Sequence, residues 1–110
     1  MEQPIVKKAT ETRIFMEGTE VCREYFKTEK LTFGSSQLQP GQTGAVDPGH
    51  KNSHEVFFVS RGHVLLNCGG LFRELFEGDA VLIPPTVPHE LTNIGDEVAL
   101  ITWSLAPSEF

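Results

Sequence analysis

Residues 78–93 read GDAVLIPPTVPHELTN and contain, in order, a short apolar run, a proline-rich turn, one histidine and a second β-prone run. Runs of this kind bounded by Gly and Pro are typical of strands joined by turns. The prolines fix φ on the approach to His89, so the imidazole is held at a defined place on a β scaffold. Upstream, residues 48–62 read PGHKNSHEVFFVSRG and bring two more histidines and a glutamate to another β-prone run. Together the two segments predict a pocket for a metal ion or a small ligand inside a small barrel.

The composition favours one domain and disfavours several classes of partner. A chain of 110 residues is enough for a single core but not for a second independent domain. The net charge is −6 and the nine Lys and Arg are scattered among acidic residues, so we expect no nucleic-acid partner. Residues 1–8 lack the apolar segment of a signal peptide and no later run has membrane-spanning length, which predicts a soluble, cytoplasmic protein without a membrane partner. Cys22 and Cys68 lack CxxC spacing and are expected to be reduced thiols.

Short β-prone runs recur along the chain between turn residues, which predicts an all-β fold. The paired glycines 69–70 predict a hairpin turn, and residues 93–96 predict a second, weaker one. Residues 20–26 are also compatible with a helical turn or two, and residues 1–10 form either a loose arm or an exchanged edge strand. The predicted strands cover residues 12–16, 20–26, 30–38, 54–60, 63–68, 71–76, 80–83, 88–93 and 98–104.

The strand that follows His54 is apolar on both faces. Because side chains alternate along a strand, Glu55, Phe57 and Val59 share one face while Val56 and Phe58 share the other. One face should line the barrel, and the other should meet a second sheet or a partner subunit, which predicts a homodimer. A carboxylate in an apolar interior needs a metal, another cation or hydrogen-bond donors, unless Glu55 lies at the solvated end of the strand.

The segment around His89 has the spacing of a known family motif. The second motif of the cupins runs glycine, five residues, proline, one residue, glycine, two residues, histidine, three residues and asparagine. Thr86 stands where the family has its second glycine. The other positions are filled in register by Gly78, Pro84, His89 and Asn93. The chain therefore resembles a small single-domain cupin over residues 31–104, within a single domain of residues 1–110, and this implies a double-stranded β-helix, or jelly-roll barrel.

The first cupin motif is matched only in its second half. Glu55 and Gly62 have the family's spacing, but the histidine pair that precedes the glutamate in cupins is absent. Counting back from Glu55 places His50 at the second histidine and Pro48 at the first. Counting forward instead makes His50 the first histidine and Asn52 the second, but it leaves too few residues before the glutamate. We prefer the count from Glu55, since its strand is well defined by alternation.

The resemblance implies a metal site made by His50, Glu55 and His89. His54 is adjacent to Glu55 and should point to the opposite face, so it would be a ligand only if a bulge intervenes. Two imidazoles and one carboxylate suit a divalent transition metal. Ligand type does not choose among Fe, Mn, Ni and Zn.

Two functions of different classes follow from the resemblance. The first is a metal-dependent enzyme of the dioxygenase, isomerase or lyase type that acts on a small organic metabolite. The second is a non-catalytic cupin, a small-ligand-binding or dimerisation module without metal, because cupins with degenerate first motifs include such proteins. The fold does not choose between them. The substrate depends on side chains distant in sequence, for which Phe33, Phe57, Leu82 and Trp103 are candidates.

Overall fold

The computed structural model describes residues 2–109, and within them the chain forms nine strands and one short 3₁₀ helix, η1 (Ala9–Glu11). Each strand overlaps one of the predicted segments, so the prediction of an all-β fold is confirmed. No helix in these residues has the length and apolar character needed to cross a bilayer. The strands are β1 (Arg13–Glu17), β2 (Glu20–Lys27), β3 (Thr32–Leu38), β4 (His54–Arg61), β5 (His63–Cys68), β6 (Leu71–Phe76), β7 (Ala80–Ile83), β8 (Glu90–Asn93) and β9 (Ala99–Ala106).

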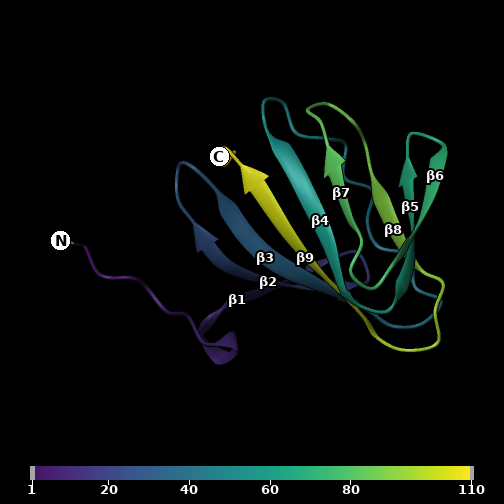
Figure 1. The fold of residues 1–110 in the computed structure, drawn as a ribbon, viewed down its shortest axis with the longest axis horizontal. Coiled ribbons are helices and arrows are strands. Elements are labelled where there is room, and N and C mark those ends of the chain that lie inside the picture. Colours follow the sequence, from purple (N-terminus) through teal and green to yellow (C-terminus); the bar gives the residue numbers. More distant parts are fainter. Residues whose placement is uncertain (1, 110) are drawn as a thin grey trace.

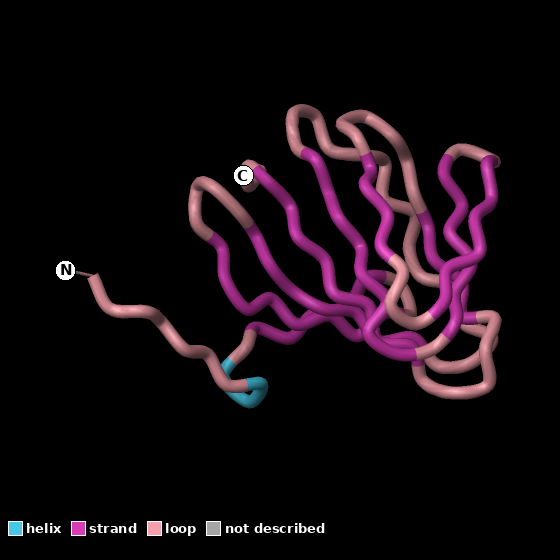
Figure 2. Tube along the Cα trace, viewed as in Figure 1, coloured by secondary structure: helices cyan, strands magenta, loops and turns pink. Residues whose placement is uncertain are grey.

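The strands form two antiparallel sheets around a common interior (Figures 1 and 2). The larger sheet has the order β1-β2-β3-β9-β4-β7, and the smaller has the order β6-β5-β8. Buried side chains of both sheets form one core: Leu38, Phe57, Val59, Val64, Leu66, Leu75, Ile83, Leu91, Ala99 and Ile101. Two sheets that share one core in this way give the predicted jelly-roll barrel.

Strand β4 has the predicted alternation. Glu55, Phe57 and Val59 are buried, whereas Val56 and Phe58 remain 38% and 42% exposed. The smaller sheet packs against the inner face of the larger one, so the expectation that a second sheet covers Val56 and Phe58 is wrong. A partner subunit remains as the predicted cover of the outer face.

The two predicted hairpin turns have different outcomes. Gly69 and Gly70 have φ angles of +59° and +94° and join the paired strands β5 and β6, so this prediction is confirmed. The prediction for residues 93–96 is wrong, because β8 pairs with β5 whereas β9 pairs with β3 and β4. This connection crosses between the sheets. Asn93 holds it by donating hydrogen bonds from Nδ2 to the carbonyl oxygens of Leu38 and Glu97, each at 2.9 Å.

Two strand boundaries show how local chemistry modifies the predicted pattern. Residues 20–27 form strand β2 rather than a helical turn, and the register with β3 shifts between Glu24 and Phe26. Strand β8 begins at Glu90 instead of residue 88, because Pro88 has no N–H to donate. His89 forms an isolated bridge with Asp47 through backbone hydrogen bonds of 2.8 and 2.9 Å. This bridge ties the loop before β4 to the start of β8.

The amino-terminal segment leads away from the strands (Figure 1). Residues 2–8 have no regular structure, and Ile5 and Val6 are 76% and 74% exposed. In a single copy this segment is an arm, in agreement with one of the two expectations. Its exchange with a second copy stays a prediction.

Candidate metal centre

Among the described residues, four side chains with metal-binding groups meet at one point in the barrel. They are Asp47, His50, Glu55 and His89, and one potential ligand atom of each lies within 4.8 Å of the others. Glu55 comes from the start of β4, His89 from the bridge before β8, and Asp47 and His50 from the loop before β4. The structure thus brings together the three residues that the resemblance implied, and it adds a second carboxylate.

The spacing of the ligand atoms suits one metal ion. Glu55 Oε1 lies 3.0 Å from His50 Nε2 and 2.9 Å from His89 Nε2, and Asp47 Oδ2 lies 3.5 Å from both imidazole atoms. An ion with ligand distances of about 2.0–2.2 Å separates neighbouring ligand atoms by roughly 3.0–3.5 Å in octahedral or tetrahedral geometry. Two imidazoles and two carboxylates therefore fit a divalent transition metal in chemistry, and the four imidazole–carboxylate distances agree with one shared ion.

His89 is held rigidly in this cluster. Its side chain is 3% exposed, and Nδ1–H donates to the carbonyl oxygen of Val87 at 3.0 Å. This bond orients the ring and leaves Nε2 to face the carboxylates, an arrangement common for metal-binding histidines. Burial by itself lowers the pKa of His89, but its hydrogen bonds to Asp47, Glu55 and Val87 outweigh burial and raise the pKa to about 10. Without metal, the site therefore holds an imidazolium between two carboxylates.

Asp47 is the candidate ligand that the sequence did not indicate. Its Oδ1 accepts a hydrogen bond from the backbone N–H of Gly49 at 2.9 Å, while Oδ2 faces both imidazoles. The hydrogen bond with His89 holds the pKa of Asp47 down at about 2. The motif count placed Pro48 at the first histidine, but the turn at Pro48 and the backbone bridge to His89 bring Asp47 inward instead. An aspartate directly before a Pro-Gly turn was the available signal.

His54 is not part of the cluster. Its pairing partner in β9 is Ala106, and Glu55 pairs with the preceding residue, Leu105, so no bulge separates the two neighbours. The His54 side chain is exposed on the outer face of β4. The condition under which it would be a ligand is therefore not met.

Thr86 links the two motif segments. Its φ angle is +71°, in the left-handed region where the family has glycine, so the backbone keeps the shape that the motif requires. The Thr86 N–H donates to the carbonyl oxygen of His50 at 2.6 Å. A β-branched residue in this region carries a steric cost of about 1–2 kcal/mol. The hydrogen bond joins the turn before His89 to the loop that carries His50.

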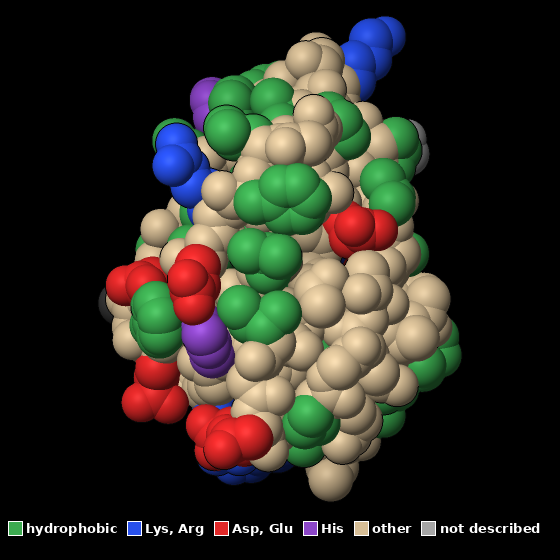
Figure 3. Space-filling view, turned by 90° about the vertical axis from the view of Figure 1, so that its right-hand side faces the viewer, with side chains coloured by type: hydrophobic (Ala, Val, Ile, Leu, Met, Phe, Trp, Pro, Cys, Tyr) green, Lys and Arg blue, Asp and Glu red, His purple; other side chains and the backbone are tan. Residues whose placement is uncertain are grey.

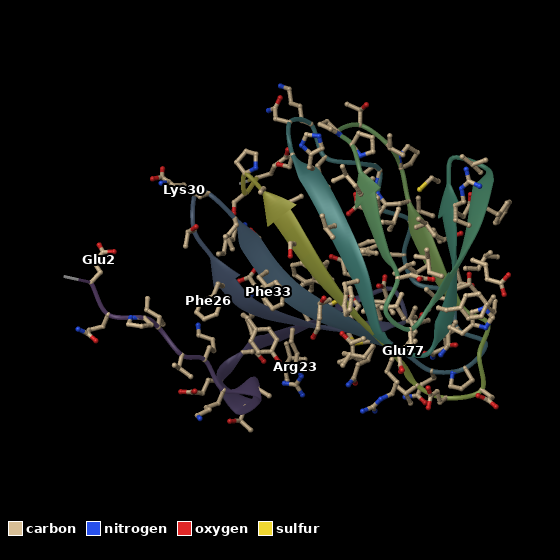
Figure 4. The ribbon with its side chains drawn as sticks, in the orientation of Figure 1. Glu2, Arg23, Phe26, Lys30, Phe33 and Glu77 are labelled. Carbon is tan, nitrogen blue, oxygen red and sulfur yellow. The ribbon has the colours of Figure 1, made fainter. Side chains whose placement is uncertain are left out.

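The cluster lies in the wall of a cavity of about 170 Å³. Among the candidates for shaping the pocket, Phe57 and Trp103 do line it. The prediction for Leu82 is wrong, because Leu82 pairs with Val56 on the outer face and is 60% exposed. The prediction for Phe33 is also wrong, since Phe33 lies outside this lining beside Tyr25, with 6.0 Å between the ring centroids (Figure 4). The remaining lining includes Phe15, Glu20, Cys22, Ser36, Leu91 and Leu105.

The two cysteines are free thiols, as predicted. Cys22 lines the cavity, and burial raises its pKa to about 11. A thiol with this pKa is almost fully protonated at neutral pH and is a poor nucleophile or metal ligand.

The carboxylate of Glu109 stabilises the loop that carries His50. It accepts hydrogen bonds from the backbone N–H groups of Lys51 at 3.1 Å and Asn52 at 2.7 Å, and from Ser53 Oγ at 2.8 Å. The bond from Asn52 is the largest cause that lowers the pKa of Glu109 to about 2. The carboxyl-terminal segment after β9 therefore holds in place the loop that carries His50 and leads into β4.

Replacing Glu109 with alanine is expected to weaken metal binding about tenfold, as loss of an outer supporting contact does in other metal sites. The reason is that residues 51–53 lose their acceptor and His50 loses its fixed position. Competition with a chromophoric chelator measures the affinity. Glu77→Ala, at an exposed acidic residue outside the site, is the control. Equal affinities for both variants would show that the carboxyl-terminal contact does not position His50.

Residues 34–105 match the family model described as a cupin domain. The chain belongs to the cupin family. This cupin is similar to an RmlC-like cupin from Shewanella frigidimarina NCIMB 400, with 19% identity, a TM-score of 0.81 and coverage of 97% of this chain and 94% of the other. It is also similar to a predicted oxalate decarboxylase from Thermotoga maritima, with 15% identity, a TM-score of 0.80 and coverage of 94% and 100%. Structural similarity at these low sequence identities shows that the proteins share a fold.

One curated relative matches a shorter part of this cupin. It is an uncharacterized protein of Methanocaldococcus jannaschii that is 34% identical over 47 residues. The match covers 43% of this chain and 38% of the relative's own length.

Proposed function

We propose that this cupin is a metal-dependent enzyme that acts on a small organic metabolite inside its barrel. The observation that supports the proposal is the cluster of Asp47, His50, Glu55 and His89 in the wall of a cavity. These four residues would hold a divalent ion, and the adjoining cavity would admit oxygen atoms of a substrate to it. A bound divalent ion would supply Lewis acidity there, polarising a carbonyl group for isomerase- or lyase-type chemistry.

The cavity limits the size of the substrate. Its volume of about 170 Å³ is close to that of an engineered apolar cavity of roughly 150 Å³ that admits benzene. The cavity therefore suits a molecule of about six to ten non-hydrogen atoms. The polar end of the substrate would face the cluster, and its carbon skeleton would pack against Phe57, Leu105 and Trp103.

Metal analysis of the purified protein tests the proposal. We expect one divalent ion per chain after purification without chelators or after incubation with Fe(II), Mn(II), Ni(II) or Zn(II). We also expect turnover of a small oxo or hydroxy acid that stops when the ion is chelated. A protein that binds none of the four ions would contradict the proposal and would support the alternative, a non-catalytic binding or dimerisation module.

We further propose that a second copy of the chain covers the outer face of β4 and β7. Val56, Phe58 and Leu82 are exposed there, and their neighbours on β9, Ser104 and Thr102, are small and uncharged. Such a face is self-complementary when two copies meet around a twofold axis. The β6 side of the molecule differs, because its exposed hydrophobic side chains are interspersed with acidic ones (Figure 3).

Replacing Phe58 with lysine is expected to convert a dimer into monomers at micromolar concentration. A charge buried at the centre of an apolar interface costs at least about 2 kcal/mol, which weakens association by about 30-fold or more. Light scattering of the wild type and the variant measures the change. Phe72→Lys, on the exposed face of β6, is the matched control. A wild-type protein that is monomeric at these concentrations would contradict the proposal.

A further inference from the structure

We propose that Glu20 is the proton-transfer residue of this cavity, and that it removes and returns a proton at the carbon next to the carbonyl group of a small 2-oxo acid. The inference rests on the proposed function, because a bound ion would hold the substrate by its two adjacent oxygen atoms. It assigns a role to a carboxyl group that the metal cluster does not use.

Glu20 lies at the start of β2 and lines the same cavity as the cluster. Its carboxyl group packs against Gly44 in the loop before β4. A Cβ atom at position 44 would overlap Glu20 Oε2, so the absence of a side chain there leaves the space that the carboxyl group fills. The carboxyl group of Glu20 is therefore part of the cavity wall, in the space beside Gly44.

Polar groups surround the carboxyl group of Glu20. Trp103 Nε1–H on β9 donates to Ser36 Oγ on β3 at 3.0 Å. Ser36 Oγ also lies 3.3 Å from Cys22 Sγ, and its hydroxyl group is near enough to Glu20 to favour the charged form of the carboxyl group. The backbone N–H of Ala45, which donates to the carbonyl oxygen of Glu17 at 3.4 Å, also favours the charged form of Glu20. Glu20 thus lies in the cavity wall beside polar groups of β3 and of the loop before β4, within reach of a bound substrate.

The surroundings also adjust the acidity of this group. Burial raises the pKa of Glu20 to about 7, although the hydrogen bonds from Ser36 and Ala45 act in the opposite direction. The charges of Glu17 on β1 and Glu55 on β4 raise it further, whereas the neighbouring thiol of Cys22 stays neutral. In the metal-free protein both forms of the carboxyl group are therefore populated near neutral pH, and a carboxyl group that can exchange a proton with its surroundings suits proton transfer.

The chemistry of the cavity points to a 2-oxo acid with a short alkyl chain. Its carboxylate and keto oxygens are adjacent, so both would face a bound ion, and the alkyl chain would lie beside Phe57 and Leu105. In the proposed step, the C3–H proton moves to the Glu20 carboxylate. The electrons of the C–H bond form a C2–C3 double bond, and the carbonyl π electrons move onto oxygen. Return of the proton to C3 restores the acid, and no oxidant or reductant is needed.

Hydrogen–deuterium exchange of 2-oxobutanoate tests this inference. The Zn(II)-loaded protein in D₂O should remove the C3 methylene signal from the ¹H NMR spectrum, at a rate well above that of chelated protein. Glu20→Gln should slow the exchange by at least about 100-fold, the usual contribution of a general base. Its zinc content and its affinity for 2-oxobutanoate, measured by calorimetry, should not change, because glutamine keeps the shape of the protonated side chain. Glu24→Gln, on the same strand but outside the cavity, should exchange like the wild type.

The outcomes separate this inference from the proposed function. If the wild-type protein binds no zinc, both the proposed function and the role of Glu20 are overturned. A zinc-loaded wild type that does not exchange 2-oxobutanoate, or a Glu20→Gln variant that exchanges it at the wild-type rate, overturns the inference and leaves the metal site intact.

A measurement on metal-free protein gives an independent readout. Carboxyl ¹³C NMR, assigned with Glu20→Gln, should show Glu20 titrating near pH 7. Ser36→Ala should move this titration to higher pH, because it removes a hydrogen bond that favours the carboxylate. Titration in the ordinary range of glutamate, with no response to Ser36→Ala, would overturn the inference.

Discussion

Replacing His89 with alanine is expected to lower metal affinity by more than about 100-fold, beyond the effect of losing an outer supporting contact. The reason is that His89 is the most deeply buried member of the cluster, and its Nε2 atom contacts both carboxylates. Its loss leaves Asp47 and Glu55 without the imidazole that lies between them. Chelator competition and metal analysis of the purified variant measure the effect.

His54→Ala is the matched control for this variant. It also removes a histidine, but from the exposed face of β4. Because alanine at position 89 also leaves a space, a His89→Gln variant and a far-ultraviolet circular dichroism spectrum of each protein are needed to show that the barrel is folded. Equal loss of metal in the His54 and His89 variants, or metal binding that survives in both His89 variants, would refute the assignment of the centre.

Metal affinity is expected to rise about tenfold per pH unit between about pH 7 and pH 9, because the ion and a proton compete for His89 Nε2. In the metal-free folded protein the pKa of His89 is raised from its ordinary 6.5 to about 10. One proton must therefore leave for each ion that binds. Chelator competition at several pH values gives the slope, and a pH indicator in weak buffer counts the released protons. A flat profile would show that Nε2 is not a ligand.

The raised pKa of His89 also determines how the stability of the metal-free protein depends on pH. A raised folded-state pKa means that the His89 contribution is fully present below pH 6.5 and is lost as the pH rises through about 10. Asp47 has the opposite sign, since its pKa is lowered from 3.8 to about 2. Its contribution is present above pH 3.8 and is lost as the pH falls through about 2. Bound metal replaces the proton on His89 and should remove the loss on the alkaline side.

The sequence predicted the strands well because strand formation and alternation are local. The period of two along β4 was enough to place Glu55 and Phe57 inward and Phe58 outward. The same argument left His54 as a ligand only in the case of a bulge, and the regular pairing of His54 and Glu55 with β9 removes that case. The hairpin prediction at residues 93–96 failed, because a turn sequence does not say whether the flanking strands belong to one sheet.

The amino-acid sequence by itself determined the all-β character of this cupin and the inward face of β4, and its resemblance to the cupin motifs implied three candidate ligands, His50, Glu55 and His89. Each depends on spacing within one short segment. The tertiary structure decided that Asp47 joins them and that Glu20 lies in the same cavity, because both depend on pairing between distant segments. The Asp47–His89 bridge joins residues 42 positions apart. Long-range backbone hydrogen bonds of this kind leave no periodic pattern in the sequence, so only the assembled barrel shows which carboxylates share its interior.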